Sequence, residues 1–276
     1  MRNAMTIAHI SDLHFGRIAD AGVIDALVDE LNGEDIDLVA LSGDLTQRAR
    51  VAEYEAARAL LEALRPPSLV VPGNHDVYPW WRPWKRLRTP LARYKRYVTD
   101  DLAPTHRTER GAVLGLTSAH GATVKGGRLR APDRAALTDF FGRMPADRFK
   151  VLVVHHQLHP TAIGAISPHP VARYAGATLE RAAEVGVDLV LCGHLHISAI
   201  RPLEIIPGTR RIVIASAGTA TSNRYRPPTG PVNLYNVIRV HPEAFTVEER
   251  RFAPNEGRFV QDSVTRFDRA PAGDTG

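Results

Sequence analysis

Residues 190–196 read Val-Leu-Cys-Gly-His-Leu-His, and this stretch decides how the rest of the chain is interpreted. The run 187–192 is apolar except for one aspartate, which is typical of a buried strand, and it ends at a glycine followed by two histidines. Beyond a strand end, positions i and i+2 point the same way, so His194 and His196 can face one point. Gly-His-x-His alone is a weak signal, so a metal site requires ligands from elsewhere in the chain.

The composition is that of an ordinary globular protein with ample core: 276 residues, 44% apolar and 24% charged. No apolar run reaches the length of a membrane helix, and the N-terminus leads into a strand without a secretory signal pattern. The single cysteine, Cys192, permits no intrachain disulfide. We therefore expect a cytoplasmic protein. The net charge of +5 favours anionic partners, unless it only reflects an arginine-rich proteome.

Strand-like and helix-like runs alternate through most of the chain. Strands are expected at 5–11, 37–41, 68–71, 112–118, 149–154 and 187–192, and helices at 20–31, 51–64, 132–141 and 179–185. The first strands and helices predict βαβ units with a parallel sheet. After residue 198 we expect antiparallel strands at 205–206, 211–215, 232–240 and 244–251. We predict one domain over residues 1–269 with two sheets, and a disordered tail at 270–276.

Five of the expected strands end in polar loops rich in metal-ligand side chains. These loops contain Asp12 and His14, Asp44, Asn74 and His75, His155, and finally His194 and His196. Taken singly, the aspartates could be helix caps, the asparagine a turn residue and His155 a hydrogen-bonded core histidine. Ligands of parallel α/β sheets bind beyond the carboxyl ends of the strands, so these loops could share one edge.

The ordered set Asp-x-His, Gly-Asp, Gly-Asn-His-Asp, His and Gly-His-x-His resembles the calcineurin-like metallophosphoesterase superfamily over roughly residues 5–222. The resemblance implies an α/β fold: a four-layer α-β-β-α sandwich with two mixed β-sheets. It also implies two transition-metal ions (Mn, Fe, Zn, Co or Ni) and hydrolysis by a hydroxide that bridges them. Protein ligands of the first ion would be Asp12, His14 and His196, those of the second Asn74, His155 and His194, and Asp44 would bridge both.

Two further roles follow from the resemblance. His75 would act at the leaving group as general acid or charge stabiliser, with Asp76 orienting its ring. His156 adjoins His155 and leaves one ligand ambiguous; the first histidine of such a pair is usually the ligand in the family, which favours His155. Gln157 stands where relatives often have proline, which puts the geometry of this loop in doubt.

For the substrate, the motifs look closest to bacterial class III cyclic-nucleotide phosphodiesterases. Two divalent ions, two aspartates and a hydroxide leave a charge of about +1, which a monoanionic diester would neutralise. A monoester would call for an added cation, and the candidates are Arg17, Arg224 and Arg226. We therefore expect a phosphodiesterase acting on a small phosphate ester. Alternatives are a DNA nuclease, a lipid-linked pyrophosphate or phosphodiester hydrolase, and a non-catalytic scaffold on this fold.

The segment 79–100 is the least generic part of the chain. Trp80, Trp84, Leu87, Leu91, Tyr94 and Val98 have the spacing of one apolar helix stripe, and seven basic residues surround it without an acidic residue between positions 79 and 99. A proline at 83 could start this helix and one at 90 should kink it. The helix could pack on the domain, cap the metal centre, or bind nucleic acid or a membrane surface. No obligate protein partner is evident.

Overall fold

The computed structural model describes residues 4–160, 171–208, 211–227 and 229–269. The tail at 270–276, predicted to be disordered, lies outside the described residues. Within the described part, none of the helices combines the length and apolarity needed to cross a bilayer.

The first sheet has six strands in the order β12-β11-β10-β1-β2-β3. Its strands are β1 (Met5–Ile10), β2 (Leu38–Leu41), β3 (Ser68–Val70), β10 (Leu234–Val240), β11 (Ala244–Ala253) and β12 (Arg258–Asp268). β1, β2 and β3 are parallel, as the βαβ pattern predicts, and β10 to β12 complete the sheet as antiparallel strands.

The second sheet also has six strands, in the order β4-β5-β6-β7-β9-β8. Its strands are β4 (Thr105–Arg107), β5 (Gly111–Gly115), β6 (Phe149–Val153), β7 (Leu189–Cys192), β8 (Ala199–Leu203) and β9 (Ile212–Ser216). β5, β6, β7 and β9 run parallel, and β4 and β8 pair antiparallel at the two edges.

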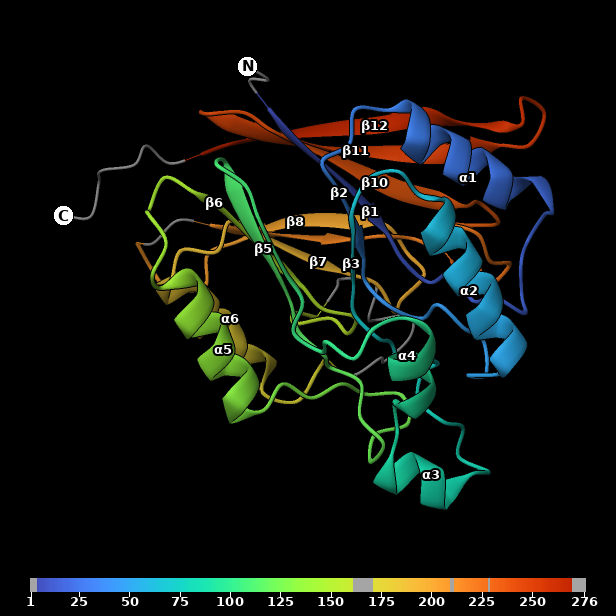
Figure 1. The fold of residues 1–276 in the computed structure, drawn as a ribbon. Helices are drawn as coiled ribbons and strands as arrows, with labels where there is room; N and C mark the ends of the chain where they lie inside the picture. Colours follow the sequence, from blue (N-terminus) through green and yellow to red (C-terminus); the bar gives the residue numbers. More distant parts are fainter. Residues whose placement is uncertain (1–3, 161–170, 209–210, 228, 270–276) are drawn as a thin grey trace.

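Helices cover both outer faces of the paired sheets (Figure 1). They are α1 (Gly22–Gly33) and α2 (Val51–Ala63) on the first sheet, and α5 (Ala131–Phe141) and α6 (Ala175–Glu184) on the second. Three buried apolar clusters match the three interfaces: helices with first sheet, sheet with sheet, and second sheet with helices. The predicted four-layer α-β-β-α sandwich with two mixed sheets is therefore confirmed.

The sequence was misleading mainly in the second half of the chain. β9 pairs antiparallel with a neighbour, β8, as predicted, but it is parallel to β7, because the chain first forms β8 at the edge of the sheet and returns between β8 and β7. The predicted strand at 205–206 is absent, and β8 ends before it. The edge strands β4, β8 and β12 were not foreseen, because only half-buried or alternating positions mark them.

The segment 79–98, which we call the cap, is not one helix. It contains α3 (Pro83–Arg88) and α4 (Ala92–Tyr97), separated at Thr89 and Pro90. Pro83 starts α3 as predicted, but Pro90 ends the helical pattern instead of kinking it, since proline lacks the amide hydrogen and clashes with the preceding turn. The cap projects from the end of the molecule that lies opposite β12 (Figure 1).

Candidate metal centre

The loops after β1, β2, β3, β6 and β7 meet where the edges of the two sheets adjoin. The contact is made by backbone as well as side chains: the amide of His194 donates to Asp12 Oδ2 at 2.9 Å, and His155 Nδ1 donates to the carbonyl of Ser42 at 2.8 Å. Both bonds join one sheet to the other. All seven predicted ligands are thereby brought into one region.

Four of them form a buried cluster whose ligand atoms all lie within 4.8 Å of one another: Asp12, His14, Asp44 and His196. His14 Nε2 lies 3.1 Å from His196 Nε2, and His196 Nε2 lies 3.2 Å from Asp12 Oδ1. Asp44 approaches this group with Oδ2, which is 3.6 Å from His14 Nε2.

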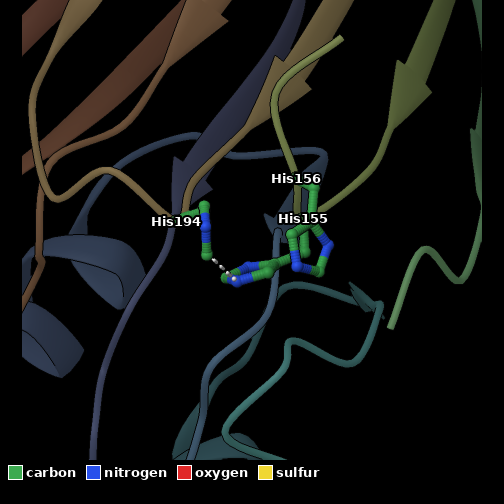
Figure 2. Close-up of side chains that lie close together, drawn as sticks. All are labelled: His155, His156 and His194. Atoms are coloured by element: carbon green, nitrogen blue, oxygen red, sulfur yellow. Dashed lines mark hydrogen bonds between the residues drawn. The ribbon is translucent and has the colours of Figure 1, made fainter. Parts of the chain in front are cut away.

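The second group gathers around His155. Its Nε2 lies 3.2 Å from Asn74 Oδ1, 3.3 Å from His194 Nδ1 and 3.5 Å from Asp44 Oδ1. Figure 2 shows the rings of His155 and His194 directed toward each other from separate strand ends. Asp44 thus presents one carboxylate oxygen to each group, which is the geometry that a bridging ligand needs.

His156 belongs to the same histidine cluster, but its ring has another partner. Its Nδ1 lies 2.8 Å from Ser118 Oγ, and its centroid is 4.8 Å from that of His155 (Figure 2). The contacts to Asn74 and Asp44 are made by His155. His156 Nε2 has no partner among the described residues, and His155, His156 and His194 together form a group that could hold a metal ion, so the choice of His155 as the ligand stays a prediction.

Hydrogen bonds fix which ring nitrogen faces the centre. The Nδ1 atoms of His155 and His196 face the carbonyl oxygens of Ser42 and Arg224, which only an N–H can satisfy. When these rings are neutral, as metal ligands are, their Nε2 atoms carry the lone pair and point at carboxylate or amide oxygens. Buried acceptors facing one another repel unless a cation lies between them, so the residues present fit metal ions. The mixed N/O set without thiolate suits transition metals such as Mn, Fe, Co, Ni or Zn.

The electrostatics of the centre agree with that fit. Burial raises the pKa of Asp44 well above its ordinary value, and the carboxylates of Asp12 and Asp76 raise it further. Burial also raises the pKa of Asp12, but charge and hydrogen bonds from His196 and His14 outweigh it and hold that pKa well below the ordinary value. Burial lowers the pKa of His14 to about 4, so the ring is neutral and able to bind a metal.

The ligand loops are held in an unfavourable backbone conformation. Five of the seven predicted ligands have positive φ: Asp12 (54°), His14 (47°), Asp44 (55°), His194 (72°) and His196 (58°). Left-handed conformations cost non-glycine residues of order 1 kcal/mol or more each and concentrate at functional sites. The fold therefore holds these side chains inward at a cost in stability.

Gly73 is required for the close approach of two loops. A Cβ there would lie 2.1 Å from Asp44 Oδ1 and 2.4 Å from the Asp44 backbone nitrogen, so the loop itself would have to move. We expect Gly73→Ala to weaken metal binding about 10- to 100-fold, the usual effect of disturbing a ligand's support. Calorimetric titration with Mn²⁺ would measure this. Gly33→Ala, where a Cβ meets nothing within 4 Å, is the matched control; equal affinities for the two variants would contradict the prediction.

His75 lies at the rim of the centre, but its predicted orienting partner is wrong. Its Nδ1 lies 2.7 Å from the carbonyl of Gln47, not near the Asp76 carboxylate. Asp76 is buried and instead accepts bonds from the amides of Leu45, Thr46 and Gly73, which ties the two loops together. The Asp76 side chain thus points into the loop interior, where it accepts from backbone amides that need an acceptor.

Of the three predicted arginines, Arg224 reaches the rim. Its Nη1 lies 3.3 Å from His75 Nε2 and 3.1 Å from Gln47 Oε1. Burial, His14 and Arg224 together lower the pKa of His75 well below its ordinary value. Arg226 is half-buried. Burial lowers its pKa, although the negative charge of Asp12 acts to raise it. Arg17 is exposed on the loop after His14.

A cavity of about 310 Å³ opens beside His75. It is lined by Gln47, Arg48, Asn74, His75, Val77, Pro79, Trp80, Trp81, Arg86, Val124, Lys125 and Arg224. Gln47, Arg48 and Lys125 were not identified as lining residues from the sequence. Gln47 could have been found from its place in the Gly-Asp-Leu-Thr-Gln loop, directly after the bridging aspartate motif.

Gln157 and Cys192 join the two loops of the second sheet. Gln157 Nε2 donates to the carbonyl of Gly193 at 2.9 Å and to Ser216 Oγ at 2.9 Å, while its Oε1 accepts from Cys192 Sγ at 3.2 Å. Glutamine in place of proline thus fastens the His155 loop to the Gly-His-Leu-His loop. Burial raises the pKa of the Cys192 thiol to about 12, so the thiol is unreactive in the folded protein.

The Calcineurin-like phosphoesterase family model matches residues 5–198, so the chain belongs to this family. It is a metal-dependent phosphohydrolase, and its family uses two transition-metal ions. Glycerophosphodiester phosphodiesterase GpdQ of Enterobacter lignolyticus is 33% identical over 212 residues, which are 70% of this chain and 71% of the relative. The 3',5'-cyclic adenosine monophosphate phosphodiesterase CpdA of Escherichia coli K12 is 23% identical over 84% of this chain and 79% of its own length.

Solved structures agree on the fold. Purple acid phosphatase PPD1 from yellow lupin (Lupinus luteus) superposes with a TM-score of 0.72 at 11% identity, covering 98% of this chain and 55% of that one. This chain thus spans about half of the lupin enzyme. PhoD superposes with a TM-score of 0.71 at 14% identity over 97% of this chain and 70% of its own. At such identities the likeness concerns the fold alone.

Proposed function

We propose that this protein hydrolyses small phosphodiesters at a two-metal centre within a single domain over residues 1–269. The observation that carries the proposal is the cavity of about 310 Å³ beside Asn74 and His75, which leaves room for a second alcohol group beyond the reacting phosphoryl group. Two of the similar proteins reported above carry phosphodiesterase names, which supports the same choice.

We assign the residues as follows. The first ion would be held by Asp12, His14 and His196, the second by Asn74, His155 and His194, with Asp44 bridging. Such ions polarise the phosphoryl group and supply a nucleophile when bound. The ions themselves are proposed to be manganese or iron, and the location to be cytoplasmic.

The chain's own side chains would divide the remaining work. Arg224 is placed to bind a phosphoryl oxygen, since its guanidinium is at the rim next to His75. His75 is held at Nδ1 by the Gln47 carbonyl and presents Nε2 toward the cavity side of the centre, and with a proton on Nε2 it would stabilise or protonate the leaving oxygen. Arg48 and Lys125 line the cavity and would attract an anionic substrate. Arg17 and Arg226 remain candidates for a further substrate contact.

A substrate panel tests the proposal directly. Protein reconstituted with Mn²⁺, Fe²⁺ or Zn²⁺ is assayed on a cyclic nucleotide, glycerophosphodiesters, bis-nitrophenyl phosphate and the matching monoesters. We expect kcat/KM to be at least about tenfold higher for diesters than for the matching monoesters, because the monoanion balances the net charge of the loaded centre. A preference for monoesters would contradict the proposed substrate class. Cleavage of single- or double-stranded DNA, or of a lipid-linked pyrophosphate, would favour those alternatives, and failure to retain two ions per chain would favour a scaffold.

A further inference from the structure

Helix α3 of the cap is oriented opposite to an ordinary surface helix. Its buried residue is Arg86, whereas Trp84 and Leu87 are 72% and 63% exposed, and Trp80, just before the helix, is 70% exposed. An amphipathic helix on a globular protein normally turns its apolar side chains inward and its charges outward. The second half of the cap follows that rule, since Leu91 and Tyr94 are buried.

The inverted orientation is fixed by the Arg86 guanidinium. Its Nε donates to the carbonyl of Gly121 at 2.9 Å, and its two terminal nitrogens donate to the carbonyls of Tyr78 and Thr123. Gly121 allows this approach, because a Cβ there would lie 1.9 Å from the Arg86 carbonyl oxygen. With its donors engaged on three backbone carbonyls, Arg86 holds α3 against the neighbouring loop. The hydrogen bonds of Arg86 therefore fix the exposed positions of the tryptophans and of Leu87, which do not result from loose packing.

The exposed face combines apolar and basic side chains. We define the cap patch as Trp80, Trp84, Leu87 and Val124 together with the exposed basic residues Arg82, Lys85, Arg88 and Lys125. Val124, 58% exposed, comes from the loop that Arg86 anchors. No acidic residue occurs between positions 79 and 99. Isolated exposed apolar residues are normal, but several large ones beside like charges mark an interaction surface.

We propose that the cap patch binds the surface of an anionic lipid bilayer. Tryptophan is favoured at the boundary between headgroups and acyl chains, leucine and valine enter the acyl region, and the basic side chains match lipid phosphates. The position of α3 agrees, because it projects from one end of the fold (Figure 1).

Two other occupants fit less well. Single-stranded nucleic acid binds along a groove with aromatic rings for its bases, whereas Leu87 and Val124 offer no ring and the patch lies on a projection. A second copy of this chain in a two-fold dimer would bring the two basic sets together, because such an interface pairs the same patch with itself. The bilayer is the occupant whose charge and apolar interior complement both halves of the patch.

Intrinsic fluorescence tests the proposal with the whole protein, because the chain has three tryptophans, all within residues 80–84. We expect vesicles of phosphatidylcholine with phosphatidylglycerol to shift the emission to the blue, and brominated acyl chains to quench it. Pure phosphatidylcholine should bind more weakly, and added salt should weaken binding to the anionic vesicles. Bilayer binding does not require catalysis, so this result stands or falls independently of the proposed substrate.

A pair of variants locates the contact. Trp84→Gln with Leu87→Gln should lower vesicle affinity about tenfold or more, measured by co-sedimentation, because two interfacial anchors are lost. Neither residue lines the cavity, so hydrolysis of a small soluble diester should be unchanged, which also shows that the variant is folded. Val264→Gln, at a position 49% exposed on β12, is the matched control and should bind like the parent.

Three outcomes would overturn the proposal. The first is the absence of vesicle binding, or binding that the double variant does not reduce. The second is a fluorescence change with single-stranded oligonucleotides but not with vesicles, which would assign the patch to nucleic acid. The third is concentration-dependent self-association, abolished by the double variant and without vesicle binding, which would assign it to a second copy.

Discussion

Asp44→Asn is expected to abolish most of the hydrolytic activity and to weaken retention of both metal ions. Asp44 directs Oδ2 to within 3.6 Å of His14 Nε2 and Oδ1 to within 3.5 Å of His155 Nε2, so it serves both groups. Asparagine keeps the size of the side chain but removes the charge and one acceptor oxygen. Disturbing the partner of a ligand costs about 10- to 100-fold in metal affinity or activity, and loss of a shared ligand should exceed that.

Metal content after gel filtration, measured together with kcat/KM on bis-nitrophenyl phosphate, checks this prediction. Asp100→Asn, at an exposed position after the cap, controls for the loss of one carboxylate. Full metal content with near-normal turnover in the Asp44 variant would show that Asp44 does not bridge. Circular dichroism shows whether Asp44→Asn is folded. If that variant is unfolded, Asp44→Glu is used in its place, because glutamate keeps the charge but moves it.

His75→Ala should leave metal binding intact and slow turnover about 10²- to 10⁴-fold, the range for loss of a general acid or base. His75 is absent from the buried metal cluster around Asp44, and its Nε2 lies at the rim, 3.3 Å from Arg224 Nη1. The loss should be greatest for esters with poor leaving groups, because an alkoxide needs charge stabilisation or protonation more than a nitrophenolate does.

Comparing nitrophenyl and alkyl diesters under the same metal conditions measures this difference. His75→Gln is the informative companion, because an amide can donate a hydrogen bond but cannot transfer a proton at neutral pH. If glutamine restores the alkyl ester rate, His75 stabilises charge; if it does not, His75 transfers a proton. Equal losses on both ester types in His75→Ala would show that His75 does not act on the leaving group.

The strands of the parallel sheets and the ligand loops were predicted well, because both depend on local patterns, whereas the four layers followed from the family resemblance. Buried parallel strands are short apolar runs, and each ends at a loop whose ligand-type side chains, such as Asp12 and His194, follow at a fixed spacing. The resemblance of the ordered motifs then supplied the pairing of loops. Edge strands such as β12 were missed, since their alternating, partly exposed residues resemble loops.

What the sequence could not provide is the direction in which individual side chains point. Asp76 follows His75 directly, and adjacency suggested a partnership, yet its carboxylate satisfies the amides of Leu45 and Thr46, which lie about 30 residues earlier in the chain. In the cap, apolar spacing predicted one buried stripe. Instead, Arg86 donates to three backbone carbonyls, so this charged residue of α3 is buried. The positions of such backbone acceptors cannot be predicted from the sequence.

The burial of the Cys192 thiol makes its alkylation rate a measure of metal occupancy at the centre. Cys192 ends β7 immediately before the loop that carries His194, and alkylation requires the structure around the thiol to open, because the thiol is inaccessible and its pKa is raised to about 12. Ions that bind only the closed form should slow alkylation of Cys192. Above Kd, each tenfold increase in metal concentration should lower the alkylation rate about tenfold. Metal occupancy can therefore be followed by mass spectrometry of an alkylated chain, before any substrate is known.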